Sequence, residues 1–325
     1  MRLGRIAPLF LAAGLAACGG QAAAPSPASS PASSATAVAI SGSPAAPAGL
    51  QQLIDGARKE GQLNFIWQDQ LAGNPADMSP WVDLFKKTYG LDMRIQLTTG
   101  QSMPQMAARI VQEVQANRPA SSDIWLGDPP SALRLLQADA LLPVDWSWAV
   151  NLQNPALVSQ SGKLVEYVWQ FPGIAYNTDK ITGALVPKTL ADMLKPEFKG
   201  KIASTPYAAH FTELAAPEVW GEQKTLDYVT KLSSQISGLI SCGEDARVSS
   251  GEFWALVIDC SGSFVDLEKA KGAPIAHVLP SDGGTFIPIY MAVPKNSVHP
   301  NAAKLWTNLV DSPEGQAILY KETAN

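Results

Sequence analysis

Short apolar runs alternate with amphipathic segments along the first half of the chain. Three runs have the apolar, β-branched or aromatic content of buried strands: Gln62–Trp67, Met93–Thr98 and Ile124–Leu126. The spacing of apolar residues between and after them predicts helices over 80–89, from about Pro104 onward and over 131–138. Such alternation is typical of an α/β fold with helices on both faces of a parallel sheet. In these sheets ligands bind beyond the carboxyl ends of the strands.

The first twenty residues have the pattern of a secretory signal peptide. Arg2 and Arg5 precede an apolar run over 6–15, which is too short to span a bilayer. The run ends in Leu-Ala-Ala-Cys, which looks like a bacterial lipobox, whose cysteine receives lipid and becomes the mature N-terminus. We therefore expect 1–17 to be a signal peptide and Cys18 to be lipidated. The alternative is an ordinary cleaved signal in which Cys18 is incidental.

Residues 18–48 are expected to hold the lipidated cysteine and a disordered linker. Their composition is almost wholly Gly, Ala, Pro, Ser and Thr, without charge. Such a segment has too little apolar side chain to offset the entropy of ordering. It would tether a folded domain to a membrane, and a glycosylated stalk would have a similar composition.

The remaining part of the chain is long enough for two lobes. About 275 residues exceed the size at which one hydrophobic core usually keeps growing. A formal charge of −5 and a hydrophobic fraction of 46% describe an ordinary globular protein, and no basic block indicates binding to nucleic acid. No later apolar run is long enough to be a transmembrane helix. We expect a monomer that reaches the membrane only through lipid on Cys18.

Cys242 and Cys260 remain once Cys18 is lipidated. An even remainder in an oxidising compartment favours one disulfide. Both cysteines follow β-like runs, Ile236–Ile240 and Trp254–Ile258. If these are neighbouring parallel strands, both cysteines lie at the same strand ends, within bridging distance. Two separate buried thiols are the alternative.

Several later segments occur in the order seen in one known family. The most specific are SDIWLGD at 122–128, GIAYNTDK at 173–180, PKTLADMLKP at 187–196, IYMAVPKNS at 289–297 and SPEGQ at 312–316. In this order they resemble the bacterial solute-binding proteins of ABC importers, in particular the group that includes ferric-ion and iron-complex binders. The resemblance extends over nearly everything from about Leu50 onward.

The resemblance implies a two-lobed α/β fold of the periplasmic-binding-protein type (type II), with a ligand cleft between the lobes. Carried onto this chain, the first lobe takes 49–150 plus 259–284, and the second takes 151–258 plus 285–325. The chain would cross between the lobes near Ala175–Tyr176, Ile258–Asp259 and Thr285–Phe286. A ligand that contacts both lobes would stabilise the closed form.

In the first lobe, the strand-end rule and the resemblance select the same loops. The candidate ligand-binding residues there are Trp67, Gln68, Asp69, Ser102 and Asp128. Each is polar or aromatic where a strand ends. The alternative is structural: Ser102 and Asp128 would cap helices, and Trp67 would pack in the core.

Ser261, Gly262 and Ser263 follow a predicted strand and open a predicted helix. Free backbone N–H groups and two hydroxyls there would point into the cleft. Ferric-ion binders carry a pair of adjacent tyrosines at this place, where this chain has Ser261 and Gly262. The difference removes the best ligands for a bare ferric ion, so we expect no metal and no cofactor. Helix-terminal N–H groups suit a carboxylate, a phosphate or a sugar-like hydroxyl.

The second lobe contributes Tyr176 at a predicted crossing, Tyr207 and, at another crossing, Thr285 and Phe286. Tyr207 would offer a flat apolar face and a polar tip to a ligand. Tyr207 and His210 could also be half of a metal site completed by Asp69 or Asp128. The alternative is a histidine that is only hydrogen-bonded or on the surface.

These observations predict an extracellular solute-binding lipoprotein that captures a small polar solute and delivers it to an ABC transporter permease. It would be exported, and anchored by Cys18 in the periplasm or on the outer face of the cell membrane. An iron or iron-complex binder of the same fold is the alternative cargo. A signalling or chaperone-like lipoprotein of the same fold also stays open.

An exported hydrolase is the competing class, and its usual motifs are missing. The chain has no Gly-x-Ser-x-Gly, Cys-x-x-Cys, His-Glu-x-x-His or phosphate-loop pattern. His277 lies in a strand-like segment, and His299 precedes Pro300 in a predicted surface turn. Glu213 and Glu218 would be a carboxylate pair for glycoside cleavage only if the fold fixed their separation. We therefore predict no enzymatic activity.

Overall fold

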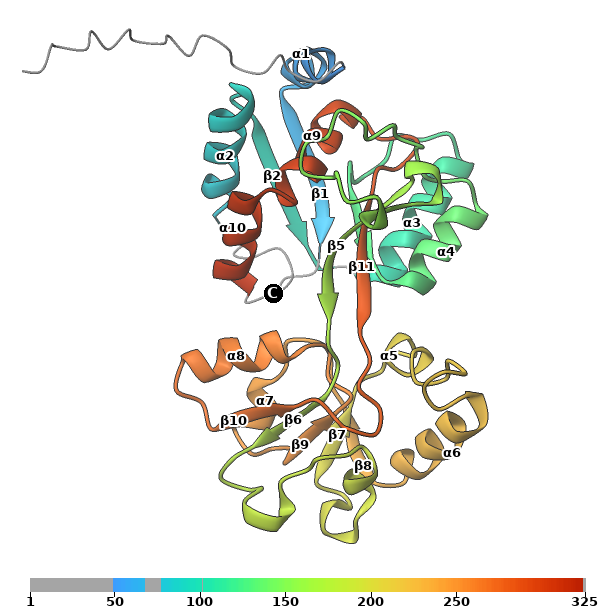
Figure 1. Ribbon diagram of the computed structural model, residues 1–325, viewed down its shortest axis with the longest axis vertical. Coiled ribbons are helices and arrows are strands. Elements are labelled where there is room, and N and C mark those ends of the chain that lie inside the picture. The colour runs from blue at the N-terminus through green and yellow to red at the C-terminus, as the bar shows by residue number, and fades with distance from the viewer. Residues whose placement is uncertain (1–48, 68–76, 101, 324–325) are drawn as a thin grey trace, which may run out of the picture. The chain divides into compact units, whose positions relative to one another are not determined.

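The computed structural model describes residues 49–67, 77–100 and 102–323. Its elements form two groups around largely separate hydrophobic cores (Figure 1), which we call the first and second lobes. The first lobe comprises the described residues up to 170 and from 287 onward; the second comprises 174–278. The predicted signal peptide, lipidated Cys18 and linker lie outside the described residues. Within those described, no helix combines the length and apolar character that crossing a bilayer needs.

The first lobe alternates helices and strands and then takes back the C-terminal segment of the chain. Its helices are α1 (Leu50–Glu60), α2 (Ser79–Tyr89), α3 (Met103–Gln115), α4 (Pro129–Gln137), α9 (Pro300–Val310) and α10 (Pro313–Thr323). Its strands are β1 (Gln62–Trp67), β2 (Arg94–Thr99), β3 (Trp125–Gly127), β4 (Val158–Ser159), β5 (Leu164–Gln170) and β11 (Ile287–Ala292). The predicted strand at 62–67 coincides with β1, and the other predicted strands and helices shift by only a few residues.

The strands of the first lobe combine parallel and antiparallel pairs. β1 and β2 are parallel, whereas β11 runs antiparallel to both β3 and β5. The Asp123 N–H donates to the carbonyl oxygen of Asn64 at 2.7 Å, which joins the approach to β3 to β1. The predicted parallel pairing is confirmed for β1 and β2, whereas the sheet that contains β3 is antiparallel. The antiparallel pairs arise because β11 returns from the second lobe into the middle of the first.

The second lobe is built on one mixed sheet. Its strands are β6 (Ile174–Asn177), β7 (Ile202–Ser204), β8 (Ile236–Leu239), β9 (Ala255–Val257) and β10 (Ile275–Val278), in the order β10-β6-β9-β7-β8. Its helices are α5 (Ala209–Thr212), α6 (Glu222–Ser233), α7 (Ala246–Ser249) and α8 (Gly262–Ala270). β7 is parallel to β8 and β9, and β6 is antiparallel to β9 and β10. Two apolar clusters divide the core of this lobe.

The chain crosses between the lobes twice, along β5 on the way out and into β11 on the way back (Figure 1). The crossing predicted near Thr285–Phe286 agrees with the start of β11. The crossing predicted at Ile258–Asp259 is wrong, because β9, α8 and β10 all belong to the second lobe. Ala175 and Tyr176 lie within β6, just after the first crossing.

The predicted assignment of segments to lobes is wrong in three places. Residues 151–170 belong to the first lobe, because β4 and β5 lie in its sheet. Residues 259–284 were expected in the first lobe, yet β10 pairs with β6 in the second. Residues 285–325 were expected in the second lobe, yet α9 packs against α1 and β1. Burial of the apolar face of α9 against α1 and β1 therefore decides where the C-terminal segment folds.

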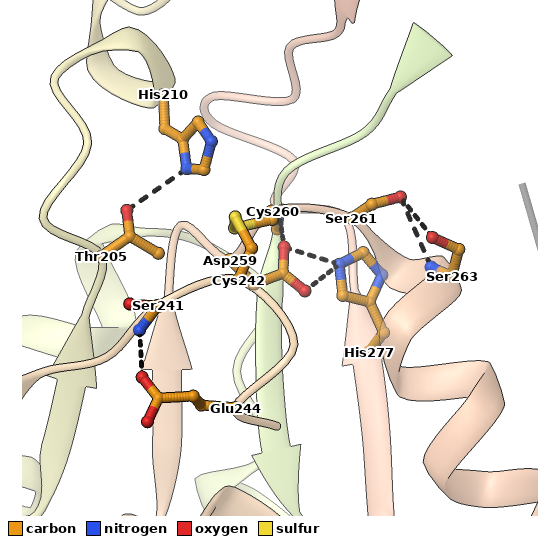
Figure 2. Close-up of a disulfide and its surroundings, with 11 residues drawn as sticks. Thr205, His210, Ser241, Cys242, Glu244, Asp259, Cys260, Ser261, Ser263 and His277 are labelled. Atoms are coloured by element: carbon orange, nitrogen blue, oxygen red, sulfur yellow. Dashed lines mark hydrogen bonds and ion pairs between the residues drawn. A yellow bond between two sulfur atoms is a disulfide. The ribbon is translucent and has the colours of Figure 1, made fainter. Parts of the chain in front are cut away.

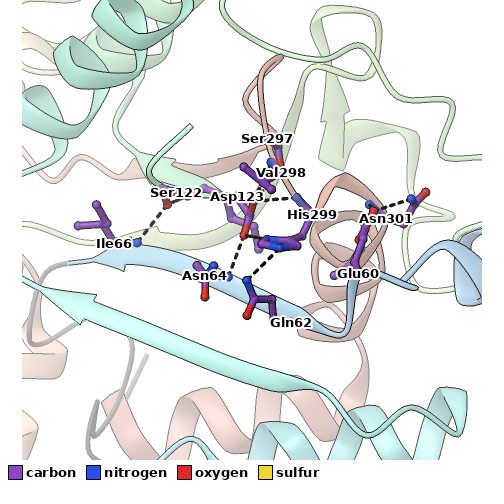
Figure 3. A network of polar contacts seen from close by, with 12 residues as sticks. Glu60, Gln62, Asn64, Ile66, Ser122, Asp123, Ser297, Val298, His299 and Asn301 are labelled. Atoms are coloured by element: carbon purple, nitrogen blue, oxygen red, sulfur yellow. Dashed lines mark hydrogen bonds and ion pairs between the residues drawn. The ribbon is translucent and has the colours of Figure 1, made fainter. Parts of the chain in front are cut away.

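A buried polar network fixes this C-terminal segment onto β1 (Figure 3). The carboxylate of Asp123 accepts hydrogen bonds from the backbone N–H groups of Asn64, Val298 and His299 at 2.8–3.1 Å. Nδ1 of His299 lies 2.7 Å from Oδ2 of Asp123. His299 is 7% exposed, so the prediction that it lies in a surface turn is wrong. His299 is buried, although it directly precedes the first residue of α9, because it is hydrogen-bonded to Asp123.

Asp311, at the end of α9, has a carboxyl group with no ion-pair partner among the described residues. Its Oδ2 atom is buried and has no hydrogen-bond partner in the described part of the chain. Burial raises the pKa of Asp311 to about 8. The folded state therefore keeps this proton at a pH where an unfolded chain has lost it, and stability falls as pH rises from about 4 to 8.

We expect Asp311→Asn to remove this loss of stability. The variant should equal the wild type near pH 3 and exceed its free energy of unfolding by about 1–3 kcal/mol near pH 9, because the amide stays neutral. Urea unfolding at the two pH values measures the difference. Asp139→Asn is the control: Asp139 is exposed and paired with Lys163 and Lys295, and its substitution should not raise stability at high pH. Equal pH profiles for wild type and Asp311→Asn would contradict the assignment.

Candidate functional site

A cavity of about 560 Å³ is lined by residues of both lobes. From the first lobe come the N-terminal turns of α3 and α4 and the end of β5. From the second come the loop before α5, α5 itself and the loop after β8. Its wall includes Ser102, Met103, Asp128, Ser131, Arg134, Gln170, Tyr207, His210, Cys242 and Ile287. A ligand in this cavity would contact both lobes at once.

Ser102 and Asp128 line the first-lobe side of the cavity as helix N-caps. The N–H of Ser102 donates to the side chain of Gln105 at 3.1 Å, and the two residues form a capping box at the start of α3. The carboxylate of Asp128 accepts from the N–H of Ser131 at 3.0 Å at the start of α4. The capping interpretation is therefore confirmed for both side chains, and both also line the cavity.

Tyr207 and His210 line the second-lobe side. Their rings meet edge to face with centroids 5.6 Å apart. His210 is 6% exposed, and its Nδ1 lies 3.2 Å from the hydroxyl of Thr205. Burial lowers the pKa of His210, against the opposing effects of Asp259 and Asp128. The cavity therefore presents a neutral imidazole and a partly exposed phenol.

Cys242 and Cys260 form a disulfide beside the cavity (Figure 2). The predicted pairing is therefore present, although the geometric reason for it was wrong. β8 and β9 are not neighbours, because β7 lies between them in the sheet. The loops after β8 and β9 extend across the end of β7 and bring the two Cα atoms to 5.6 Å. Cys242 is part of the cavity wall.

The possible metal ligands near the cavity are already bonded in other ways. A nitrogen of His210 and the sulfur atoms of Cys242 and Cys260 lie within 4.8 Å of one another. The two sulfur atoms form a disulfide, so neither is available as a thiolate. Of the two carboxylates expected to complete a site with Tyr207 and His210, Asp128 caps α4 and Asp69 lies outside the described residues. In the folded chain, Tyr207 and His210 are therefore suited to hydrogen bonding and ring contact with a ligand.

Ser261 is buried at the start of α8. It caps α8 and is 4% exposed, and its Oγ accepts from the N–H and the hydroxyl of Ser263 at 3.4 and 3.1 Å (Figure 2). Ser261, Gly262 and Ser263 do not line the cavity. The expectation that they point into it fails because Ser261 and Ser263 bond each other.

Asp259 fixes the loop before Ser261. Its Oδ1 accepts from the N–H of Gly173 at 2.7 Å, and Nε2 of His277 lies 3.2 Å from its Oδ2 (Figure 2). Burial alone would lower the pKa of His277, but the bond to Asp259 and its charge raise it overall. Ile258, just before, has φ of 55°, a left-handed conformation that is strained for a β-branched residue. Such strain beside a cavity is common at functional sites.

Four other predicted site residues lie away from this cavity. Trp67 is fully buried in the first-lobe core, and Tyr176 is partly buried against the second-lobe core. Thr285 and Phe286 lie at the crossing into β11, where Phe286 is exposed and stacks on Trp169. Gln68 and Asp69 lie outside the described residues. Of the predicted ligand-binding residues, the structure brings together Ser102, Asp128 and Tyr207.

Part of the cavity wall consists of residues that the sequence did not indicate. Ser131 and Arg134 of α4, and Gln170 at the end of β5, also line the cavity. A signal for Ser131 was its place in the helix turn capped by Asp128. Gln170 was not predicted because the strand that ends with it, β5, was not predicted. Arg134 was not predicted because the direction of its side chain depends on how α4 packs.

Comparison with known proteins agrees with the fold. The model of the bacterial extracellular solute-binding protein family matches residues 122–324. The Fe(3+)-binding periplasmic protein of Serratia marcescens is 26% identical over 253 residues, covering 75% of this chain and 73% of that protein. These matches overlap the segments that carry the resemblance seen in the sequence.

Two solved structures are similar in fold. Iron-bound HitA from Pseudomonas aeruginosa is 21% identical with a TM-score of 0.66, covering 80% of this chain and 84% of that one. AfuA from Actinobacillus pleuropneumoniae, with fructose-6-phosphate bound, is 22% identical with a TM-score of 0.63, covering 81% and 83%. The predicted type of fold is confirmed.

The chain belongs to the bacterial extracellular solute-binding proteins. It is an extracellular or periplasmic solute-binding protein of an ABC transporter, and this family is not enzymatic. The predicted class of protein is therefore confirmed. The solutes named for its relatives differ, from ferric iron to a sugar phosphate.

Proposed function

We propose that the protein captures a small polar organic solute in the cavity between its lobes and delivers it to an ABC transporter permease. The observation that carries this proposal is the composition of the cavity wall. Ser102 and Asp128 come from the first lobe, and Tyr207 and His210 from the second. A solute that bonds to both sets favours the closed arrangement by its differential affinity for the two states.

The charges on the wall suit a polar solute with few charged groups. Asp128 is the one carboxylate and Arg134 the one basic side chain among the described residues that line the cavity, and His210 is neutral. Asp128 is already engaged at the N-terminus of α4. Tyr207 offers an aromatic face for a flat solute. A polyamine, which needs several carboxylates, fits this wall poorly.

An iron complex is the second candidate, because the curated relative from Serratia marcescens is named as an Fe(3+)-binding protein. A bare ferric ion prefers anionic oxygen ligands. The described wall offers one phenol, Tyr207, and one carboxylate, Asp128. A chelated iron, which brings its own oxygen ligands, is compatible with this wall where a bare ion is not.

We expect Tyr207→Ala to weaken binding of the natural solute about tenfold, through loss of ring contact worth about 1–1.5 kcal/mol. Native mass spectrometry of protein purified from its own host identifies the solute, and calorimetry then measures the affinity. Tyr320→Ala is the matched control, because Tyr320 is 69% exposed on α10 and does not line the cavity. Equal affinities of Tyr207→Ala and wild type would remove Tyr207 from the site.

We also propose that the chain is exported and anchored by lipid on Cys18. The support is the sequence: a short apolar run ending in Leu-Ala-Ala-Cys, followed by a segment without charge. Anchoring would keep the protein near its permease. Mass spectrometry of the mature N-terminus tests this directly, since an unmodified N-terminal residue other than Cys18 would contradict it.

A further inference from the structure

A second cavity of about 370 Å³ lies against β5, and it differs in character from the first. Its wall includes Glu166, Tyr167, Trp169, Phe171, Asp311 and Gln316. We propose that this cavity is a binding site for an organic cation, of the alkylammonium class, that is separate from the solute cavity. The proposal depends on two groups of residues, one aromatic and one acidic.

The aromatic group is unusually exposed. Trp169 and Phe171 are 50% and 43% exposed, and Trp169 stacks on Phe286 with ring centroids 5.0 Å apart. A contiguous exposed aromatic patch on a protein surface commonly marks a binding site. The face of an indole ring attracts cations, and aromatic walls are a common means of recognising quaternary ammonium groups.

The ionisable side chains on the cavity wall are acidic rather than basic. Oε2 of Glu166 accepts from Nε1 of Trp169 at 3.1 Å, which places a carboxylate at the edge of that ring. Asp311 adds a second carboxyl, whose buried Oδ2 has no partner in the described part of the chain. No Lys or Arg is among the described residues that line this cavity. An unpaired buried carboxyl on a cavity wall calls for a partner, and a cation supplies one.

A bound cation would also change the protonation of Asp311. Burial raises the pKa of this carboxyl to about 8, so the empty site holds a proton near neutral pH. A positive charge nearby favours the ionised form, so binding releases the proton. The other titratable groups on the wall are Glu166 and Tyr167, and burial keeps Tyr167 neutral by raising its pKa.

The site is distinct from the solute cavity because the two cavities share no wall residue. Gln170 lines the solute cavity, whereas its neighbours Trp169 and Phe171 line the second cavity. β5 leads into the first crossing between the lobes (Figure 1), so a cation bound there touches a strand that joins the lobes.

Calorimetry with choline and its neutral carbon analogue, 3,3-dimethyl-1-butanol, tests the proposal. The two molecules have nearly the same shape and differ in charge. We expect choline to bind the full-length protein near pH 8 with one site, and the neutral analogue to bind at least about tenfold more weakly. Equal affinities would show an apolar pocket only, and absence of binding by both choline and tetramethylammonium would overturn the proposal.

Variants locate the site. Trp169→Ala and Asp311→Asn should each weaken choline binding about tenfold. Trp169 is half exposed and Asn matches the shape of Asp311, so both variants should fold, which circular dichroism checks. Tyr207→Ala, in the solute cavity, should leave choline affinity unchanged. If Tyr207→Ala loses choline binding while Trp169→Ala and Asp311→Asn keep it, the cation binds in the solute cavity and the proposal is wrong.

Discussion

Asp123→Ala is expected to lower the free energy of unfolding by about 3–5 kcal/mol, because a buried charged acceptor disappears from a network that needs it. Asp123 is 2% exposed. Its carboxylate accepts from three backbone N–H groups, of Asn64, Val298 and His299, and from the hydroxyl of Ser297 (Figure 3). Alanine would leave these donors buried without partners. Urea unfolding followed by circular dichroism measures the loss.

Asp145→Ala is the matched control for this prediction. The carboxylate of Asp145 is exposed and accepts a hydrogen bond from the nearby N–H of Ser147. Its removal should leave the unfolding midpoint almost unchanged. A loss below about 1 kcal/mol for Asp123→Ala would show that water replaces the carboxylate, and that the network does not attach the C-terminal segment to β1.

The paired substitution Cys242→Ala with Cys260→Ala is expected to cost about 3 kcal/mol. The disulfide closes a loop with a sequence separation of 18, and a crosslink of that length removes about this much free energy from the unfolded chain. The loop includes β9 and part of the wall of the solute cavity. We therefore also expect weaker solute binding, since the wall would be less ordered. Urea unfolding and calorimetry measure the two effects.

Reduction provides the control for the disulfide. A dithiol should lower the unfolding midpoint of the wild type to that of the double variant, and should not change the double variant. The single substitution Cys18→Ser should leave the midpoint unchanged with or without reductant. If reduction has no effect on the wild type, the bond does not form in solution and the predicted stabilisation is wrong.

Much of the local structure of this fold could be predicted from the sequence. β1 coincides with its predicted range, and α2, α3 and α4 were expected within a few residues. These elements are encoded by local signals, namely apolar periodicity and capping residues such as Ser102. The pairing of strands was not predictable in the same way. Antiparallel β6, β10 and β11 depend on contacts between residues far apart in the sequence.

The same distinction explains which site residues were found. Ser102 and Asp128 follow from rules on strand ends and helix starts, and both line the solute cavity. Ser261 obeys the same rules but is buried, and its hydroxyl accepts a hydrogen bond from Ser263. Gln170 and Asp311 have no local signal at all. Their positions follow from how the two crossing strands and the C-terminal helices pack.

Because β11, α9 and α10 return to the first lobe, the two lobes can complete their folding only in one order during synthesis. Synthesis proceeds from the N-terminus, so 174–278 is available in full before the last segment of the first lobe exists. The second lobe can therefore assemble early, while the partner of α1 and β1 is still missing. Domains generally fold as units, and an unfinished one exposes apolar surface. Until the final forty or so residues arrive, this chain depends on whatever shields that surface.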